Sequence, residues 1–110
     1  MYSLDTESTG LWFTHGCQTF AIGAYNGEDF EMAHRCINPE TRRRYIGFGD
    51  AAITNVRNMF ESEDLIAIHN SEFDIKALVE AGFFHKDEPT KPEFWKRIVD
   101  TTILSHLHHN

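Results

Sequence analysis

The sequence contains no long hydrophobic run and no recognisable leader. No stretch approaches the roughly 18 to 20 apolar residues that span a bilayer. The first residues also lack a basic region followed by an apolar run, which is the pattern of a secretory signal. We therefore expect a cytoplasmic protein with no membrane partner.

Cysteine is scarce: only Cys17 and Cys36 occur, and they form no paired CxxC motif. Without such a motif, a structural zinc site is not expected. We place the two cysteines on neighbouring strands, so both a disulfide and two separate thiols are compatible with the pattern. Two buried thiols are the favoured interpretation in a reducing cytosol.

Basic residues are also few. Ten Lys and Arg stand against seventeen Asp and Glu, which gives a net charge of −7. This balance argues against a passive nucleic-acid binder, which would carry a basic surface. It does not exclude an enzyme that binds phosphate through metal ions, because bound cations reverse the local sign of charge. The short basic run at residues 42–44 is either a solvated loop or a phosphate contact.

What the sequence does contain is the pattern of one small α/β domain over residues 1–110. Its hydrophobic share of 41% and aromatic share of 13% are enough to bury a core. Residues 1–5 suit a buried strand. Residues 18–25 and 30–37 alternate as two further strands, joined by Asn26-Gly27, a strong hairpin signal.

The second half of the chain alternates between strands and helices. Apolar residues recur at helical spacing after Asp50, which we expect to cap that helix. Residues 64–68 form a short strand, and a second helix begins at Ser71 and stops at Gly82. A short strand within 94–99 leads to a third helix capped by Asp100. Antiparallel strands followed by alternating units predict an α/β domain with a mixed sheet.

Three acidic residues, Asp5, Glu7 and Asp74, are candidates for chemistry. Asp5 and Glu7 are two positions apart at the end of the first strand, so their side chains point to the same face. Two carboxylates on one face repel each other, and a divalent cation such as Mg²⁺ removes that penalty. An Asp-x-Glu pair also occurs in ordinary surface turns. Asp74 equally fits a capping pattern, with Ser71 at the cap and an acid three residues later.

The surroundings of these acids resemble a known family. The three segments, in chain order, are Ser3-Leu4-Asp5-Thr6-Glu7-Ser8-Thr9-Gly10-Leu11, then His69-Asn70-Ser71-Glu72-Phe73-Asp74, then Ile98-Val99-Asp100-Thr101-Thr102. Together they resemble the DxE, HNxxFD and DT segments of the DnaQ-like 3′→5′ exonucleases, which use four catalytic carboxylates. The likeness is greatest to the proofreading exonuclease domain of phage-type family A DNA polymerases.

The resemblance implies a ribonuclease H-like mixed sheet with flanking helices, truncated at its C-terminus. It implies that Asp5, Glu7 and Asp74 bind two divalent cations, Mg²⁺ or Mn²⁺, and are catalytic. It implies that a single-stranded DNA 3′ end is held by residues around the same cleft, namely Thr6, Gly10, Leu11, Asn70 and Phe73. The remainder of a polymerase chain is the expected partner, in the host cytoplasm if the protein is viral.

The family's third motif, which carries the fourth carboxylate, does not occur before Asn110. We therefore expect this chain to have little or no activity and a poorly supported last helix. The terminal cluster of His106, His108 and His109 has poor ligand geometry and does not replace the missing motif. Trp12 and Phe13 are candidates for stacking on unpaired bases, and core packing is the competing interpretation.

Other functions remain compatible with the sequence. One is a standalone exonuclease of the same family that acts on RNA or small oligonucleotides. Another is a non-catalytic remnant that only binds nucleic acid. A third is an unrelated α/β domain in which the acids coincide by chance.

Overall fold

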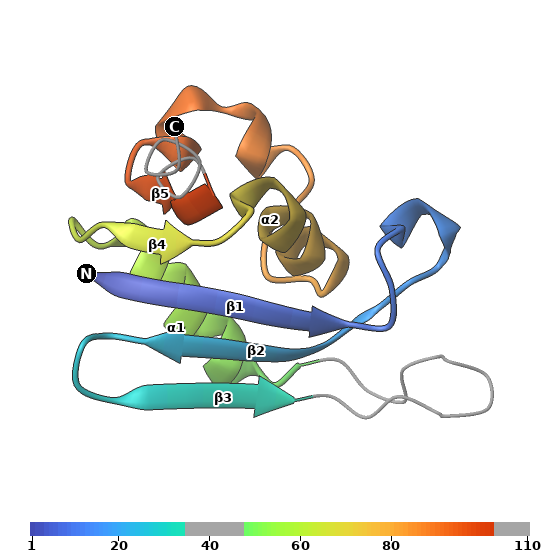
Figure 1. Cartoon of the computed structure of the whole chain (residues 1–110), viewed down its shortest axis with the longest axis horizontal. Helices are drawn as coiled ribbons and strands as arrows, with labels where there is room; N and C mark the ends of the chain where they lie inside the picture. The colour runs from blue at the N-terminus through green and yellow to red at the C-terminus, as the bar shows by residue number, and fades with distance from the viewer. Residues whose placement is uncertain (35–47, 103–110) are drawn as a thin grey trace.

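Five strands form one mixed sheet at the centre of the fold (Figure 1). The computed structural model describes residues 1–34 and 48–102. The strands are β1 (Tyr2–Ser8), β2 (Thr19–Tyr25), β3 (Phe30–His34), β4 (Ile66–Ile68) and β5 (Ile98–Asp100), and their order in the sheet is β3-β2-β1-β4-β5. β1 pairs antiparallel with β2 and parallel with β4. The expected α/β class with a mixed sheet is therefore confirmed.

The predicted hairpin joins β2 to β3. The side-chain oxygen of Asn26 accepts hydrogen bonds from the amides of Glu28 (2.8 Å) and Asp29 (2.7 Å). Gly27 follows with a φ of 102°, a conformation that a residue without Cβ adopts freely. These contacts close the turn and set the register in which Tyr25 lies opposite Phe30.

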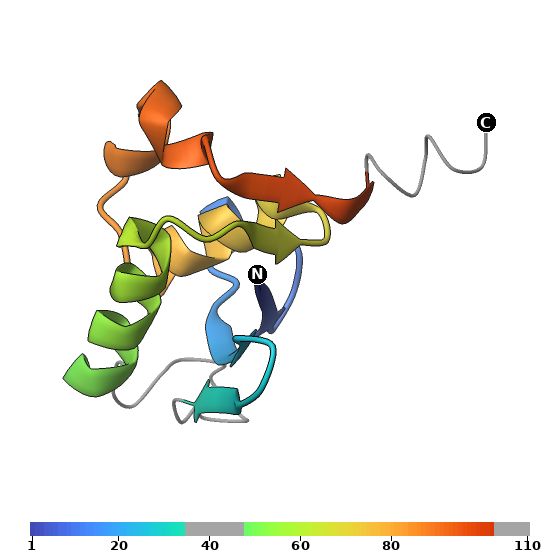
Figure 2. The ribbon, with the colours of Figure 1, turned by 90° about the vertical axis from the view of Figure 1, so that its left-hand side faces the viewer.

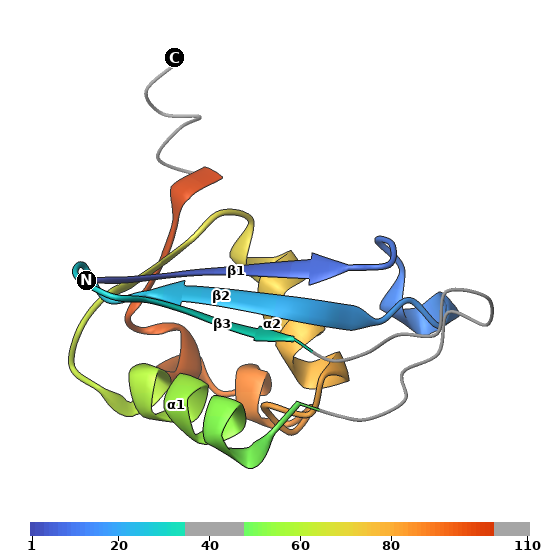
Figure 3. The same cartoon turned by 90° about the horizontal axis from the view of Figure 1, so that it is seen from below.

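Two helices, α1 (Asp50–Glu61) and α2 (Ser71–Glu80), lie on the same side of the sheet (Figures 2 and 3). Their apolar faces and the inward residues of the strands form one buried cluster, whose members include Leu4, Ile22, Val56, Met59, Ile66, Ile68, Ile75 and Leu78. No described helix covers the opposite side. One face of the sheet is therefore packed and the other is open.

Both helices begin where the sequence predicts, at Asp50 and Ser71, but their N-caps lie one residue earlier than expected. Gly49, not Asp50, is the N-cap of α1, and Asp50 is the first helical residue. Asn70, not Ser71, is the N-cap of α2, and neither N-cap residue makes a side-chain capping bond. Asn70 has a φ of 60°, which Asn tolerates better than most residues. This left-handed residue turns the chain sharply from β4 into α2, and propensity reasoning placed the turn one residue late.

The end of α2 agrees with the prediction, whereas the end of β1 does not. Gly82, with a φ of 87°, follows α2 as expected, and the amide of Phe83 bonds back to the carbonyl of Leu78 at 2.9 Å. β1 continues past the expected end at Asp5 to Ser8, because Glu7 and Ser8 still pair with β2 across a register shift.

The remaining expectations concern the cysteines, the basic run, the histidine cluster and membrane helices, and several of these residues lie outside the described part of the chain. Cys17 was expected on a strand, but it lies in the loop before β2, which begins only at Thr19. Its side chain is a free thiol. Cys36, the basic run at 42–44 and the histidine cluster at 106–109 lie outside the described residues. None of the helices within 1–34 and 48–102 has the length and apolar character needed to cross a membrane.

Candidate active site

β1 presents its two acids on the open face of the sheet. Asp5 and Glu7 are exposed, whereas Leu4 and Thr6, which alternate with them along the strand, are buried against the helices. This alternation follows from the pleat of a strand, in which successive side chains point to opposite sides. The sequence prediction that the two acids share one face is confirmed. Asp5 also lines a hollow of about 440 Å³ on that face, together with His69 and Thr101.

Asp74 reaches β1 from the first turn of α2. Its carboxylate accepts a hydrogen bond from the hydroxyl of Thr6, a residue 68 positions earlier in the chain. Both residues are buried, with Asp74 only 3% exposed. The bond holds the first turn of α2 against the middle of β1. Asp74 therefore does not form a capping box with Ser71, which the sequence offered as the alternative to a catalytic role.

The pKa of Asp74 is raised to about 6, mainly by burial and in smaller part by the negative charge of Asp5. The hydrogen bond from Thr6 acts in the opposite direction, because it favours the ionised form. Asp5 is thus close enough to disfavour the charged form of Asp74. A bound cation between or beside them would relieve both the burial and the repulsion.

Glu7 occupies the same face as Asp5, further along the strand, opposite Ala21 of β2. Within the described ranges, no group of three His, Cys, Asp or Glu side chains is arranged so that it could hold a metal ion. The structure thus brings Asp74 against β1 next to the position of Asp5, but on the packed side of the strand, whereas Asp5 and Glu7 lie on the open side. The two-metal site stays a prediction.

Asp100 holds the start of α2 in place, a role that local sequence reasoning missed. Its carboxylate accepts hydrogen bonds from the amides of Ser71 (2.8 Å) and Asn70 (3.2 Å) and from the hydroxyl of Ser71 (2.7 Å). The same carboxylate accepts from the amide of Thr102 (2.9 Å) and from its hydroxyl. The helix predicted after Asp100 lies almost wholly outside the described residues. Bonds from Thr102 and Ser71 hold the pKa of Asp100 far below its usual range.

One carboxylate therefore binds both the start of α2 and Thr102. The positive end of the α2 dipole and the unpaired first amides of α2 both favour a negative charge there. One sequence signal for this role of Asp100 was available. Asp100 and Thr101 follow directly after a predicted strand, and that strand lies beside the strand that leads into α2. A second contact joins the same segments, since the ring of His69 lies 3.0 Å (Nδ1 to Oγ1) from the hydroxyl of Thr101.

Gly10 lies in the turn that follows β1. A Cβ at this position would stand 2.6 Å from the sulfur of Cys17, closer than packing allows. The carbonyl of Gly10 accepts from the hydroxyl of Ser8 at 2.7 Å, and Thr9 and Gln18 close the base of the loop with two bonds of 2.9 Å. The loop of residues 10–17 therefore leaves the sheet as a closed unit, with its tip exposed.

The tip of that loop forms one wall of a large groove over α2. The groove has a volume of about 990 Å³ and is lined by residues of three segments: Leu11, Trp12, Phe13, Thr14, Asn70, Glu72, Phe73, Ile75, Lys76, Val79, Glu80, Lys86, Pro89 and Trp95. In Figure 1 the turn around η1 (Phe13–His15) lies to one side of α2, and the segment that follows α2, drawn in orange, lies above α2. Three predicted substrate residues, Leu11, Asn70 and Phe73, thus share one groove.

Thr6 and Gly10, the other two predicted substrate residues, do not line it. Phe13 packs on Phe73 with ring centroids 5.3 Å apart, which joins the loop to α2. Phe13 is half-buried, whereas Trp12 is 66% exposed. Packing against Phe73 thus explains why Phe13 is half-buried, whereas core packing does not explain the exposed Trp12 side chain.

No family model matches this chain, and no curated protein is significantly similar to it. The family likeness therefore rests on the three sequence segments.

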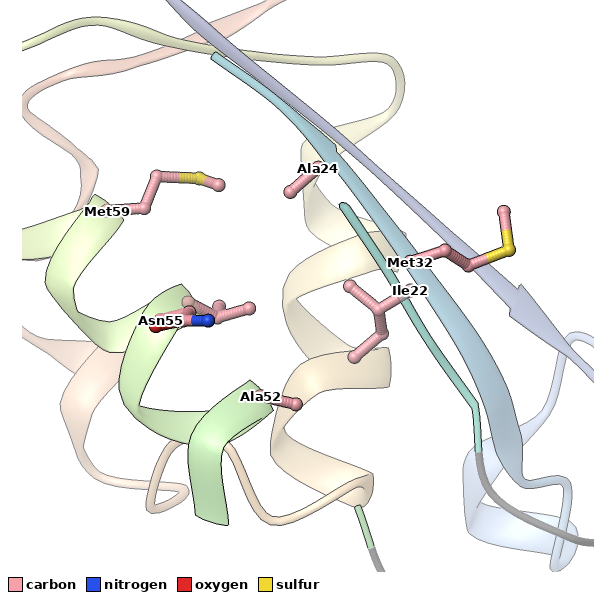
Figure 4. A pocket seen from close by; sticks show the side chains of 7 residues that line it. Ile22, Ala24, Met32, Ala52, Asn55 and Met59 are labelled. Atoms are coloured by element: carbon pink, nitrogen blue, oxygen red, sulfur yellow. The ribbon is translucent and has the colours of Figure 1, made fainter. Parts of the chain in front are cut away.

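A second hollow, between α1 and β2, is unsuited to catalysis (Figure 4). It measures about 340 Å³ and is lined mainly by apolar side chains, among them Ile22, Ala24 and Met59. Figure 4 shows Met59, Asn55 and Ala52 of α1 facing Ile22 and Ala24 of β2, while Met32 points away. None of its lining residues is ionisable.

Proposed function

We propose that this chain is part of a metal-dependent 3′→5′ exonuclease domain of the DnaQ-like family, with a ribonuclease H-like sheet. Its substrate would be a single-stranded DNA 3′ end, and its setting the proofreading part of a DNA polymerase. The observation that carries the proposal is the hydrogen bond from Thr6, the residue between Asp5 and Glu7, to Asp74, because it joins two of the sequence segments on which the likeness depends.

The sheet supports the proposal as well. A central β1 has an antiparallel hairpin on one side and two parallel strands on the other. This is the arrangement expected of a ribonuclease H-like sheet. The acids of β1 and of the first turn of α2 lie near its centre. The site is therefore built on rigid elements, and the hydrogen bonds of Asp100 hold the α2 side of it.

The chain's own residues suggest a division of work. Asp5 and Asp74 would hold the divalent cations, which when bound supply activation of water and neutralisation of phosphate charge. Thr6 orients the carboxylate of Asp74 by donating its hydroxyl to it. Asn70 and Phe73 line the groove beside Asp74, where they would contact the terminal nucleotide.

Metal binding tests the proposal without requiring turnover. We expect Mn²⁺ titrated calorimetrically into the chain, with thymidine 5′-monophosphate present, to bind, and we expect Asp5→Asn and Asp74→Asn to abolish that binding. Asp64→Asn is the matched control, because Asp64 is exposed and remote in sequence from both acids. Absence of Mn²⁺ binding, or equal binding by all four proteins, would refute the assignment.

A second function, nucleic-acid binding without catalysis, is favoured by one observation. The groove over α2 contains neither Asp5 nor Glu7 nor Asp74, so ligand binding there does not need the acids. Oligonucleotide binding that persists in EDTA, with no Mn²⁺ binding, would support this function over the first.

A further inference from the structure

The hollow between α1 and β2 continues into a second one (Figure 4). The walls of the first hollow are well buried, since Ile22 of β2 and Val56 and Met59 of α1 are each at most 6% exposed. The second hollow, of about 220 Å³, shares Ala24, Asn55 and Met59 with the first as lining residues. The two hollows therefore form one trough between α1 and the sheet.

The first hollow is the apolar end of this trough. Among the described residues that line it, Asn55 is the only polar one. Its volume of about 340 Å³ falls within the range of small-molecule sites, roughly 300 to 1,000 Å³. The unbranched thioether of Met59 can adapt to ligands of different shape. This end of the trough therefore suits the apolar body of a small molecule.

The second hollow is the polar end. It is lined by Tyr2 from β1, Asp29 from the turn between β2 and β3, and Asn58 from α1. The phenol of Tyr2, the carboxylate of Asp29 and the side-chain amide of Asn58 have no hydrogen-bond or ion-pair partner among the described residues. Each of the three offers an oxygen that can accept a hydrogen bond.

The charge of the polar end selects the head group of a ligand. No Lys, Arg or His belongs to the described residues that line either hollow, so an anionic head would meet the carboxylate of Asp29 without a compensating cation. An ammonium group carries a positive charge, three N–H donors and no acceptor. It therefore matches three acceptors, one of which is negatively charged.

We propose that the trough binds a free small primary amine, with its ammonium group among Tyr2, Asp29 and Asn58 and its apolar body between α1 and β2. This site goes beyond the proposed function and does not depend on it. None of the three acids of the candidate active site, Asp5, Glu7 and Asp74, lines either hollow.

Chain length and head group test the two ends of the trough separately. The chain is titrated calorimetrically at pH 7 with methylamine, propylamine and hexylamine, and with 1-hexanol and hexanoate. We expect the affinity of the amines to rise about fourfold with each CH₂ group that is buried. We expect hexylamine to bind about tenfold more tightly than 1-hexanol, because hydrogen bonds to a charged group are stronger, and hexanoate to bind most weakly. Absence of hexylamine binding, or equal affinities of hexylamine and hexanoate or of hexylamine and methylamine, would overturn the proposal.

Substitutions then test each end against a matched control. Ala52→Leu should fill the apolar end and weaken hexylamine binding at least about tenfold without lowering the melting temperature. Ala51→Leu, an exposed position of the same helix outside both hollows, should leave binding unchanged. Asp29→Asn should remove the preference for hexylamine over 1-hexanol. Glu28→Gln changes an exposed acid of the same turn outside both hollows and should retain that preference.

Amide shifts in NMR spectra locate the ligand, and the outcomes separate this site from the proposed function. Hexylamine should shift amides of β2 and α1, whereas shifts spread over the exposed acids of this chain of net charge −7 would show non-specific binding and overturn the proposal. Equal hexylamine affinities of Ala52→Leu and Ala51→Leu would do the same. If circular dichroism shows that Ala52→Leu is unfolded, Asp29→Asn decides, because Asp29 is exposed and bonds to Asn26 only through its backbone. Hexylamine binding without Mn²⁺ binding would refute the exonuclease assignment and support this site.

Discussion

Asp100 offers the strongest test of how the candidate site is held together. Its carboxylate accepts five hydrogen bonds, two from the amides at the start of α2, one from the hydroxyl of Ser71 and two from Thr102. Replacing Asp100 by Asn keeps the size of the side chain but removes its charge. It also turns an NH₂ group toward donors that need an acceptor.

The expected cost follows from the two cap-like sets of bonds that Asp100 accepts, one at the start of α2 and one at Thr102. Loss of one cap costs typically about 1 kcal/mol, within a range of roughly 0.5 to 2. Losing both sets of bonds should therefore lower the free energy of unfolding by about 2 kcal/mol. We expect no larger loss, because Asp100 is partly exposed and water can replace some of the lost bonds. For a domain of this size, the melting temperature should fall on the order of 10 °C. Asp64→Asn, at an exposed site, should change it little.

The pH dependence supplies a second measurement. The pKa of Asp100 is lowered in the folded state, so its contribution is fully present above the ordinary carboxyl pKa of about 4. It is lost as the pH falls through the lower, folded value. The stability difference between wild type and Asp100→Asn should therefore be constant from pH 7 to 5 and shrink below about pH 4.

Urea unfolding at several pH values measures this difference, and hydrogen exchange adds local detail. The amides of Asn70 and Ser71 should exchange faster in Asp100→Asn, because both lose their acceptor. The reasoning is refuted if Asp100→Asn costs no more than Asp64→Asn, or if its cost is the same at pH 2.5 as at pH 7.

Three further predictions concern neighbouring parts of the fold. Asp74→Asn should stabilise the metal-free chain at pH 8 by at most roughly 3 kcal/mol, because a folded-state pKa of about 6 means that the charged form is disfavoured. The gain should diminish as the pH falls from 6 toward 4, and an unchanged gain in urea unfolding at pH 4 would contradict it. Gly10→Ala should cost about 1 to 3 kcal/mol by overpacking against the Cys17 sulfur, and adding Cys17→Ala should recover most of that loss in a double-mutant cycle. Arg57→Met should cost about 1 kcal/mol through lost bonds to Glu88 and to a backbone carbonyl, and 1 M salt should remove little of that effect if hydrogen bonding dominates.

Much of the secondary structure was predictable because its signals are local. The alternation at 18–25, the Asn26-Gly27 turn and the helical spacing after Asp50 each depend on residues close in the chain, and all are confirmed. The N-caps were placed one residue late, and for α2 the cause is a contact from outside its own segment. Asn70 adopts a left-handed conformation while Asp100, from β5, satisfies the amides that a cap would otherwise take.

The sequence by itself determined that Asp5 and Glu7 share one face of a strand, since a period of two in β1 requires it. Only the tertiary structure decided that Asp74 lies under Thr6, that Asp100 binds the start of α2, and that both tryptophans line one groove. Each of these contacts joins residues from separate elements, and their meeting depends on strand order and helix packing. The periodicity of a single segment carries no information about which neighbour it will meet.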